Sequence, residues 1–306
     1  MKVIDDFVYI GSEATGHGLQ VFDMTKLLKV KPESPQVFSI TSDLTAHYTG
    51  FGSSHNIVAL EERSIIMAVG TGADANCRGG LFMLDVKNPE KPKPAGCLSA
   101  GGYVHDAQCV VYRGVDTRFS GRQICFNYNE DSLDITDITD KSNPITISST
   151  GYNGATYTHQ GWLADENMRF LLLDDELDEQ KKAGPASNQH TTTYIVDVSN
   201  LEKPLFTGTY QSPAISIDHN QYVVDGLSYQ ANYGSGLRIV DVRSLNTDPT
   251  GRGINEVGYF DCYPEDDGVG GKADFTGTWS VYPYFKSGHI LLNSIERGVF
   301  VLRYNA

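Results

Sequence analysis

Four histidines recur along the chain at similar intervals. His55, His105, His159 and His219 are separated by 50, 54 and 60 residues, and Trp279 follows after another 60. Imidazole is a common ligand of zinc, copper and iron, so a fold that gathers these side chains would create a site for one transition metal. A structural role is the alternative, in which each histidine hydrogen-bonds a neighbouring repeat. Trp279 shows that the repeat tolerates another residue at this position.

Carboxylate and amide side chains fall between the histidines. They would accept hydrogen bonds from the imidazole N–H groups or supply hard oxygen ligands for calcium. Their spacing does not match the twelve-residue helical calcium loop, and acidic loops are usually just solvated. These candidates are Asn129, Asp131, Asp174, Glu176 and Glu296.

Two further carboxylates, Glu130 and Asp175, are candidates for a general base if the histidines hold a catalytic metal. A serine nucleophile has little support, because the chain has no Gly-x-Ser-x-Gly motif and Ser294 lacks an obvious base.

A second repeat must position these residues. It consists of a small residue, alternating apolar positions and a terminal aspartate, which occurs at Asp23, Asp85, Asp137, Asp197 and Asp241. The alternation indicates a β-strand, and the aspartate is suited to accept a hydrogen bond from the turn that follows.

The two repeats together predict four-stranded units. Each unit has a His-led strand, a second strand, the Asp-ended strand and a short fourth strand. Such units at this length are typical of a β-propeller. We expect an all-β single domain over residues 1–306 with about six visible blades and a seventh in the full-length protein. The last unit ends after its third strand, so its fourth must come from elsewhere.

Propeller geometry would gather the candidate residues. The first strand of each blade lines the central channel, and its start lies on the same face as the loop between the second and third strands. We therefore expect the four histidines and the carboxylates to surround one mouth of the channel.

Five cysteines are present. Cys109 and Cys125 fall in the first and second strands of one unit, and Cys77 and Cys97 flank the third and fourth strands of another. We predict two disulfides, with Cys262 left over, and hence an oxidising compartment. The alternative is that all five are buried thiols.

The composition is that of a globular protein with an acidic balance. The 306 residues contain 24 Lys and Arg against 38 Asp and Glu, for a formal net charge of −14. Without a basic cluster to neutralise phosphates, nucleic acid is not an expected partner. No apolar run reaches the length of about 18 residues that a membrane span requires.

Several segments resemble known proteins. Strands such as Tyr194–Asp197 and Arg238–Asp241 resemble the LVIVD repeat, and the chain as a whole is similar to the choice-of-anchor B proteins. The resemblance implies a secreted or cell-surface protein whose biochemical role is not established. It also implies a leader and a further amino-terminal blade, which we expect to be missing here. The segments that carry the second resemblance are Tyr103–Tyr112, Phe126–Asp131, Thr158–Leu163, Leu173–Glu179 and Trp279–Tyr284.

Three functions are compatible with these features. The first is a binding module whose aromatic and acidic loops recognise a glycan, a peptide or a small molecule. The second is a metal-dependent enzyme built on the four histidines. In the third, the same residues only hold neighbouring blades together. We favour the first.

Overall fold

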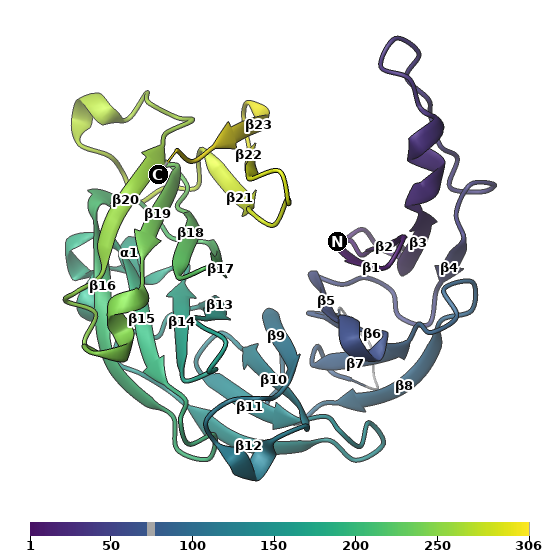
Figure 1. The fold of residues 1–306 in the computed structure, drawn as a ribbon, viewed down its shortest axis with the longest axis horizontal. Coiled ribbons are helices and arrows are strands. Elements are labelled where there is room, and N and C mark those ends of the chain that lie inside the picture. The colour runs from purple at the N-terminus through teal and green to yellow at the C-terminus, as the bar shows by residue number, and fades with distance from the viewer. Residues whose placement is uncertain (72–76, 306) are drawn as a thin grey trace. The chain divides into compact units, whose positions relative to one another are not determined.

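The computed structural model describes residues 1–71 and 77–305. Regular structure in these residues is almost entirely β (Figure 1). The α-helix α1 spans Asp178–Lys181. Short 3-10 helices cover Met24–Lys29, Glu61–Arg63, Thr117–Phe119, Gly184–Asn188, Arg243–Asn246 and Asp267–Val269.

The strands form five four-stranded sheets and one three-stranded sheet within the described residues, and each strand pairs with the next one along the chain. The first three sheets are β1–β4 (Lys2–Ile4, Phe7–Ile10, Leu19–Asp23, Ala46–Tyr48), β5–β8 (Asn56–Leu60, Ile65–Val69, Leu81–Asp85, Lys93–Leu98) and β9–β12 (Asp106–Val111, Gln123–Tyr128, Leu133–Asp137, Ile145–Thr150). The last three are β13–β16 (Thr158–Leu163, Phe170–Asp175, His190–Asp197, Leu205–Ile215), β17–β20 (Asn220–Val224, Leu227–Ala231, Leu237–Asp241, Asn255–Phe260) and β21–β23 (Thr278–Tyr282, His289–Ser294, Gly298–Arg303).

Six successive sheets of this kind are the blades of a β-propeller, so the predicted fold class is confirmed. The last blade has three strands, and no strand from elsewhere in the described chain pairs with β23. The expectation that the fourth strand of this blade comes from elsewhere stays a prediction. Val299 and Val301 of β23 are exposed, as expected for an edge strand without a neighbour.

The chain forms two compact units. Unit 1 comprises Met1–Val111, Gly121–Asn129 and Asp134–Ile147, and unit 2 comprises Tyr112–Ser120, Glu130–Leu133 and the residues from Ser148 onward. The expectation of a single domain over residues 1–306 stays a prediction.

The repeated aspartates end the third strand of five blades, as predicted. In each case the carboxylate accepts a hydrogen bond from the backbone N–H two residues later, at 2.8–3.0 Å. An aspartate suits this position because its side chain can satisfy an N–H group that the sheet no longer pairs. These aspartates therefore set where the third strands stop.

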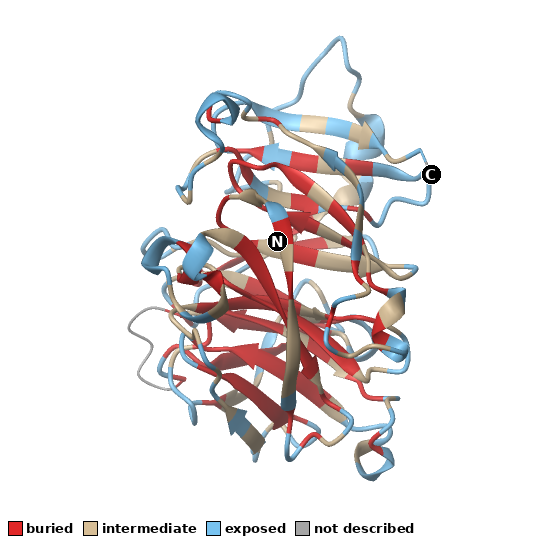
Figure 2. Ribbon diagram, turned by 90° about the vertical axis from the view of Figure 1, so that its left-hand side faces the viewer, coloured by how far each residue is buried: buried red, intermediate tan, exposed pale blue. Residues whose placement is uncertain are grey.

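Two of the second strands, β6 and β14, are buried on both faces, so burial does not alternate along them. Every residue of Ile65–Val69 and of Phe170–Asp175 is buried. Figure 2 shows buried residues concentrated on the strands and exposed residues on the connecting segments. A continuous apolar run is the pattern expected of a strand covered on both sides.

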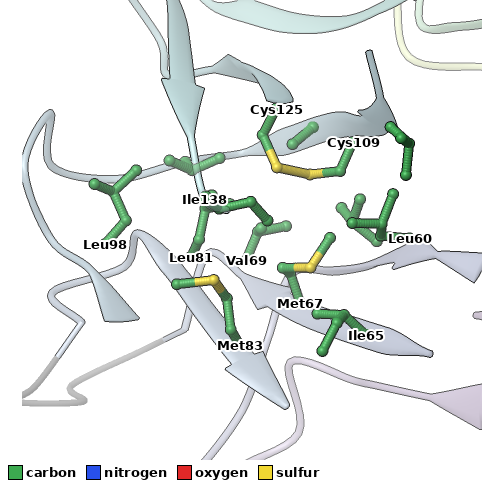
Figure 3. Close-up of a cluster of buried hydrophobic side chains, with 14 residues drawn as sticks. Leu60, Ile65, Met67, Val69, Leu81, Met83, Leu98, Cys109, Cys125 and Ile138 are labelled. Carbon is green, nitrogen blue, oxygen red and sulfur yellow. A yellow bond between two sulfur atoms is a disulfide. The ribbon is translucent and has the colours of Figure 1, made fainter. Parts of the chain in front are cut away.

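Unit 1 contains both of the disulfides that the strand order predicts. Cys109 and Cys125 face each other across β9 and β10, and Cys77 is bonded to Cys97. The Cys109–Cys125 bond lies in a core cluster with Met67 and Met83 (Figure 3). Cys262 is a buried free thiol in unit 2.

Candidate metal centre

Three side chains of unit 2 converge as metal ligands would. His159 is the second residue of β13, Glu176 directly follows β14, and His219 directly precedes β17. One ligand atom from each lies within 4.8 Å of the others, and this is the single such group of three or more in the described chain. We call these residues the triad.

The triad is compact and largely shielded from water. His159 Nε2 lies 3.7 Å from Glu176 Oε2, and His219 Nε2 lies 3.6 Å from Glu176 Oε1. The two imidazole centroids are 4.4 Å apart. The side chains are 3%, 14% and 5% exposed for His159, Glu176 and His219. Glu176 is therefore the most exposed member of the triad.

A β-bulge aims His159. Pairing between β13 and β14 shifts register between Thr158 and Gln160, which leaves His159 as the extra residue. The same shift occurs in the last blade between Thr278 and Ser280, so Trp279 occupies an equivalent bulge. Bulges redirect a side chain at the end of a strand, and they often occur beside functional sites.

A backbone carbonyl fixes the tautomer of His219. Its Nδ1 lies 2.5 Å from the carbonyl oxygen of Trp279. Because a carbonyl only accepts hydrogen bonds, Nδ1 carries a proton, and Nε2 is the ring nitrogen left to face the site. Most metal-bound histidines are held in this way.

Tyr233 holds Glu176 in place. Its hydroxyl donates a hydrogen bond to Glu176 Oε1 at 2.5 Å. Burial, followed by the charge of Glu176, raises the pKa of Tyr233, so its hydroxyl stays protonated and continues to donate. The backbone of Tyr233 has a φ of +33°, and its carbonyl accepts a hydrogen bond from the N–H of Thr278 at 2.8 Å. Such strain is tolerated only where surrounding contacts enforce it.

Aromatic rings border the triad. The centroid of Trp279 lies 4.6 Å from that of His219, and Tyr157 lies 6.4 Å from His159. Phe275 packs edge-on against Tyr233. Trp279 is 44% exposed, so part of its indole is available to a ligand.

The other two predicted histidines meet in unit 1. The rings of His55 and His105 are 4.0 Å apart, and His55 Nδ1 lies 2.8 Å from Glu13 Oε1. Glu13 is a neighbour that the sequence did not suggest. The structure thus groups the histidines as one pair in each unit, and the four-histidine site stays a prediction.

Asp174 and Asp175 differ from expectation because they are the buried end of β14 and not part of a loop. Asp175 accepts hydrogen bonds from Tyr152, from the hydroxyl and N–H of Thr156, and from the N–H of Tyr157. Asp174 accepts a hydrogen bond from Gln221 Nε2 at 2.7 Å. The carboxylate of Asp175 therefore ties the end of β14 to the segment between β12 and β13.

The remaining carboxylate and amide candidates are not members of the triad. Asn129 donates to Asp134 and to the carbonyl of Gly101 in unit 1. Glu130 and Asp131 are exposed, and the backbone of Glu130 pairs with Thr158. Glu296 is exposed and accepts a hydrogen bond from the N–H of Gly277. Of the seven carboxylate and amide candidates, Glu176 is the one in the triad.

Comparisons with known proteins agree with the fold. The LVIVD repeat profile matches residues 121–150 and 192–212, so the chain carries LVIVD repeats. Both matched stretches include an Asp-ended third strand, β11 or β15. No curated protein matches the chain. No helix of the described residues is long and apolar enough to cross a membrane.

Three solved structures are similar over nearly the whole chain. The periplasmic gluconolactonase PpgL of Pseudomonas aeruginosa has 10% sequence identity and a TM-score of 0.65, covering 98% of this chain and 79% of that one. A protein of unknown function from Desulfotomaculum acetoxidans has 12% identity and a TM-score of 0.57, covering 98% and 76%. The computationally designed protein Ika8 has 10% identity and a TM-score of 0.54, covering 99% and 70%. At these identities the similarity establishes the fold alone.

Proposed function

We propose that the protein is an exported β-propeller of the choice-of-anchor B type that binds zinc through His159, Glu176 and His219. The metal and the aromatic rings beside it would form a binding site for an external ligand. The observation that carries the proposal is the convergence of two imidazoles and one carboxylate from separate strand ends.

The composition of the triad supports an open metal site. Two histidines and one glutamate are a known zinc ligand set, and three protein ligands leave a coordination position for water or a ligand. The same set also suits iron(II), so elemental analysis must identify the metal. Trp279, being partly exposed, offers a flat apolar surface next to that position. A glycan, a peptide or a small molecule with an oxygen donor could use both features.

Two features support a location outside the cytoplasm. The disulfides Cys77–Cys97 and Cys109–Cys125 are typical of an oxidising compartment. The similarity to choice-of-anchor B proteins implies export, and the gluconolactonase with the same fold is described as periplasmic.

A metal-dependent hydrolase is the second candidate, favoured by the same open coordination position. A bound zinc ion would polarise a carbonyl or lower the pKa of a bound water. In this reaction, Tyr233 would hold Glu176 in the ligating orientation through its hydroxyl. A lactone is one substrate worth assaying, although the gluconolactonase shares only the fold.

The test is metal content and zinc affinity in protein purified without chelators or nickel resin. We expect about one equivalent of zinc per chain in the wild type, and its loss in His159→Ala and His219→Ala. His289→Ala is the matched control, because His289 is exposed on β22 and outside the triad. A wild type that neither contains nor binds a transition metal would contradict the proposal, as would binding that survives both triad substitutions.

A further inference from the structure

The connection between the third and fourth strands is much longer in the first blade than in the next three. It spans residues 24–45, whereas the equivalent connections span 86–92, 138–144 and 198–204. We call residues 24–45 the arm. Figure 1 shows the arm, drawn in purple, extending away from β1–β4. A long connection in an otherwise regular fold usually carries a function.

Contacts close to the sheet order the base of the arm. Phe38 packs edge-on against Phe22 of β3, with ring centroids 4.9 Å apart. Lys26 Nζ donates a hydrogen bond to the carbonyl oxygen of Asp43 at 2.6 Å, and it lies 5.7 Å from the centroid of the Phe22 ring. The outgoing and returning halves of the arm are therefore joined near β3.

The tip of the arm, residues 27–37, exposes apolar side chains. Val37 and Leu28 are 93% and 86% exposed, the highest values of any large apolar side chain in the described chain. Leu27 is 48% exposed. Single exposed apolar residues are common on proteins, but a group of them on one projecting segment marks an interaction surface.

Lysines lie beside these apolar side chains. Lys29 and Lys31 line a hollow of about 390 Å³, and Val37 forms part of the same wall. Residues 26–31 contain three lysines and no acidic residue, and Glu33 is the single acid of the tip. The arm therefore presents basic and apolar groups together, in a protein whose formal net charge is −14.

We propose that the tip of the arm binds the surface of a lipid bilayer that contains anionic headgroups. Leu28 and Val37 would enter the boundary between headgroups and acyl chains, while Lys29 and Lys31 contact the lipid phosphates. Lysine suits this position because its long stem stays with apolar groups and its ammonium stays in the polar layer. Charges elsewhere on the acidic protein are screened beyond a Debye length of about 8 Å, so the charge of the tip dominates at contact.

A lipid surface fits the tip better than a second protein does. A stable protein interface takes about 20–30 residues on each side, which is more than the tip contains. Membrane contact through a few aliphatic and basic side chains is weak and reversible, and it needs no such area. The arm belongs to unit 1, so this surface is separate from the triad in unit 2.

The experiment is co-sedimentation of the intact protein with lipid vesicles. Vesicles of equal parts phosphatidylglycerol and phosphatidylcholine are compared with vesicles of phosphatidylcholine alone. We expect about half of the protein to sediment with the anionic vesicles at about 1 mM lipid, and much less with the neutral ones. Raising the salt concentration to about 0.5 M should release the protein, because the Debye length falls to about 4 Å.

Two double variants test the two kinds of contact. Leu28→Ser/Val37→Ser should weaken binding by about tenfold or more, because it removes both apolar side chains. Lys29→Gln/Lys31→Gln should also weaken binding by about tenfold or more, because it removes two charges that attract the headgroups. All four side chains are exposed, so both variants should keep the fold. Val269→Ser is the control, because Val269 is 70% exposed in unit 2.

Absence of sedimentation with the anionic vesicles would overturn the proposal, as would equal binding to both kinds of vesicle or binding that survives both double variants. Analytical ultracentrifugation without lipid measures the oligomeric state. A wild type that dimerises, with dimers lost in Leu28→Ser/Val37→Ser, would assign the tip to a second copy of this chain and would also overturn the proposal. None of these outcomes depends on zinc, so the result is separate from that of the metal test.

Discussion

At the scale of single residues, the candidate zinc site depends on groups that hydrogen-bond its ligands without being ligands themselves. The carbonyl of Trp279 fixes the tautomer of His219, and the hydroxyl of Tyr233 fixes one oxygen of Glu176. Neither group is a ligand, yet each limits the orientations that its partner can adopt. Loss of a partner of this kind typically lowers metal affinity by about 10- to 100-fold.

Tyr233→Phe tests this point. The substitution removes the hydrogen bond to Glu176 and keeps the ring, so we expect zinc affinity to fall by about 10- to 100-fold while the fold is retained. Affinity is measured by competition with a chelating dye, and circular dichroism checks the fold. Tyr282→Phe is the control, because Tyr282 is 46% exposed on β21. Equal affinity in the two variants would show that Tyr233 does not position Glu176.

At the scale of elements, the buried carboxylate of Asp116 connects two segments of unit 2. Asp116 lies in the connection between β9 and β10, and Arg118 binds both of its carboxylate oxygens, at 2.8 and 2.7 Å. The N–H of Leu201, which lies between β15 and β16, donates to the same carboxylate at 3.1 Å. The hydrogen bonds from Arg118 lower the pKa of Asp116. A lower pKa in the folded state means that ionised Asp116 stabilises the fold.

Asp116→Asn should therefore destabilise the protein in a pH-dependent way. The stabilisation by Asp116 is present above its unfolded pKa of about 3.9 and is lost as pH falls through its lower folded pKa. We expect a loss of about 1–3 kcal/mol at neutral pH that shrinks as pH falls below about 3.9, measured by urea unfolding. Glu202→Gln is the control, because Glu202 meets Arg118 at the surface, where ion pairs contribute little. A pH-independent difference would contradict this account.

At the scale of the whole molecule, the disulfides and the candidate metal site lie in different units. Both disulfides lie in unit 1, whereas the triad lies in unit 2. A disulfide acts mainly by restricting the unfolded chain, and a bound ion acts by favouring the folded state. Reductant and chelator should therefore affect different parts of the chain.

Hydrogen exchange followed by mass spectrometry tests this division on metal-loaded protein. Reductant should speed exchange in unit 1 peptides such as those of β5–β10, because losing a disulfide costs about 2–4 kcal/mol. Chelator should speed exchange in peptides covering β13, β14, α1 and β17. Each treatment is the control for the other. Equal responses of both units to either reagent would show that the units do not open independently.

The sequence by itself determined the class of fold and the positions of most strands. Period-two alternation and an aspartate that accepts a hydrogen bond two residues later are local properties, readable from consecutive residues. The third strands therefore end where Asp23, Asp85, Asp137, Asp197 and Asp241 predicted. Strand order also predicted both disulfides, because Cys109 and Cys125 lie on paired strands, and Cys77 precedes the strand that pairs with the one holding Cys97.

Only the tertiary structure decided which candidates form a site. Glu176 was one of several similar carboxylates, and its contact with His159 and His219 depends on a bulge and on where β14 ends. Asp178 and Glu179 belonged to an acidic stretch of the kind that is usually solvated, yet they are buried. Burial and convergence depend on segments far apart in the chain, so spacing along one strand does not reveal them.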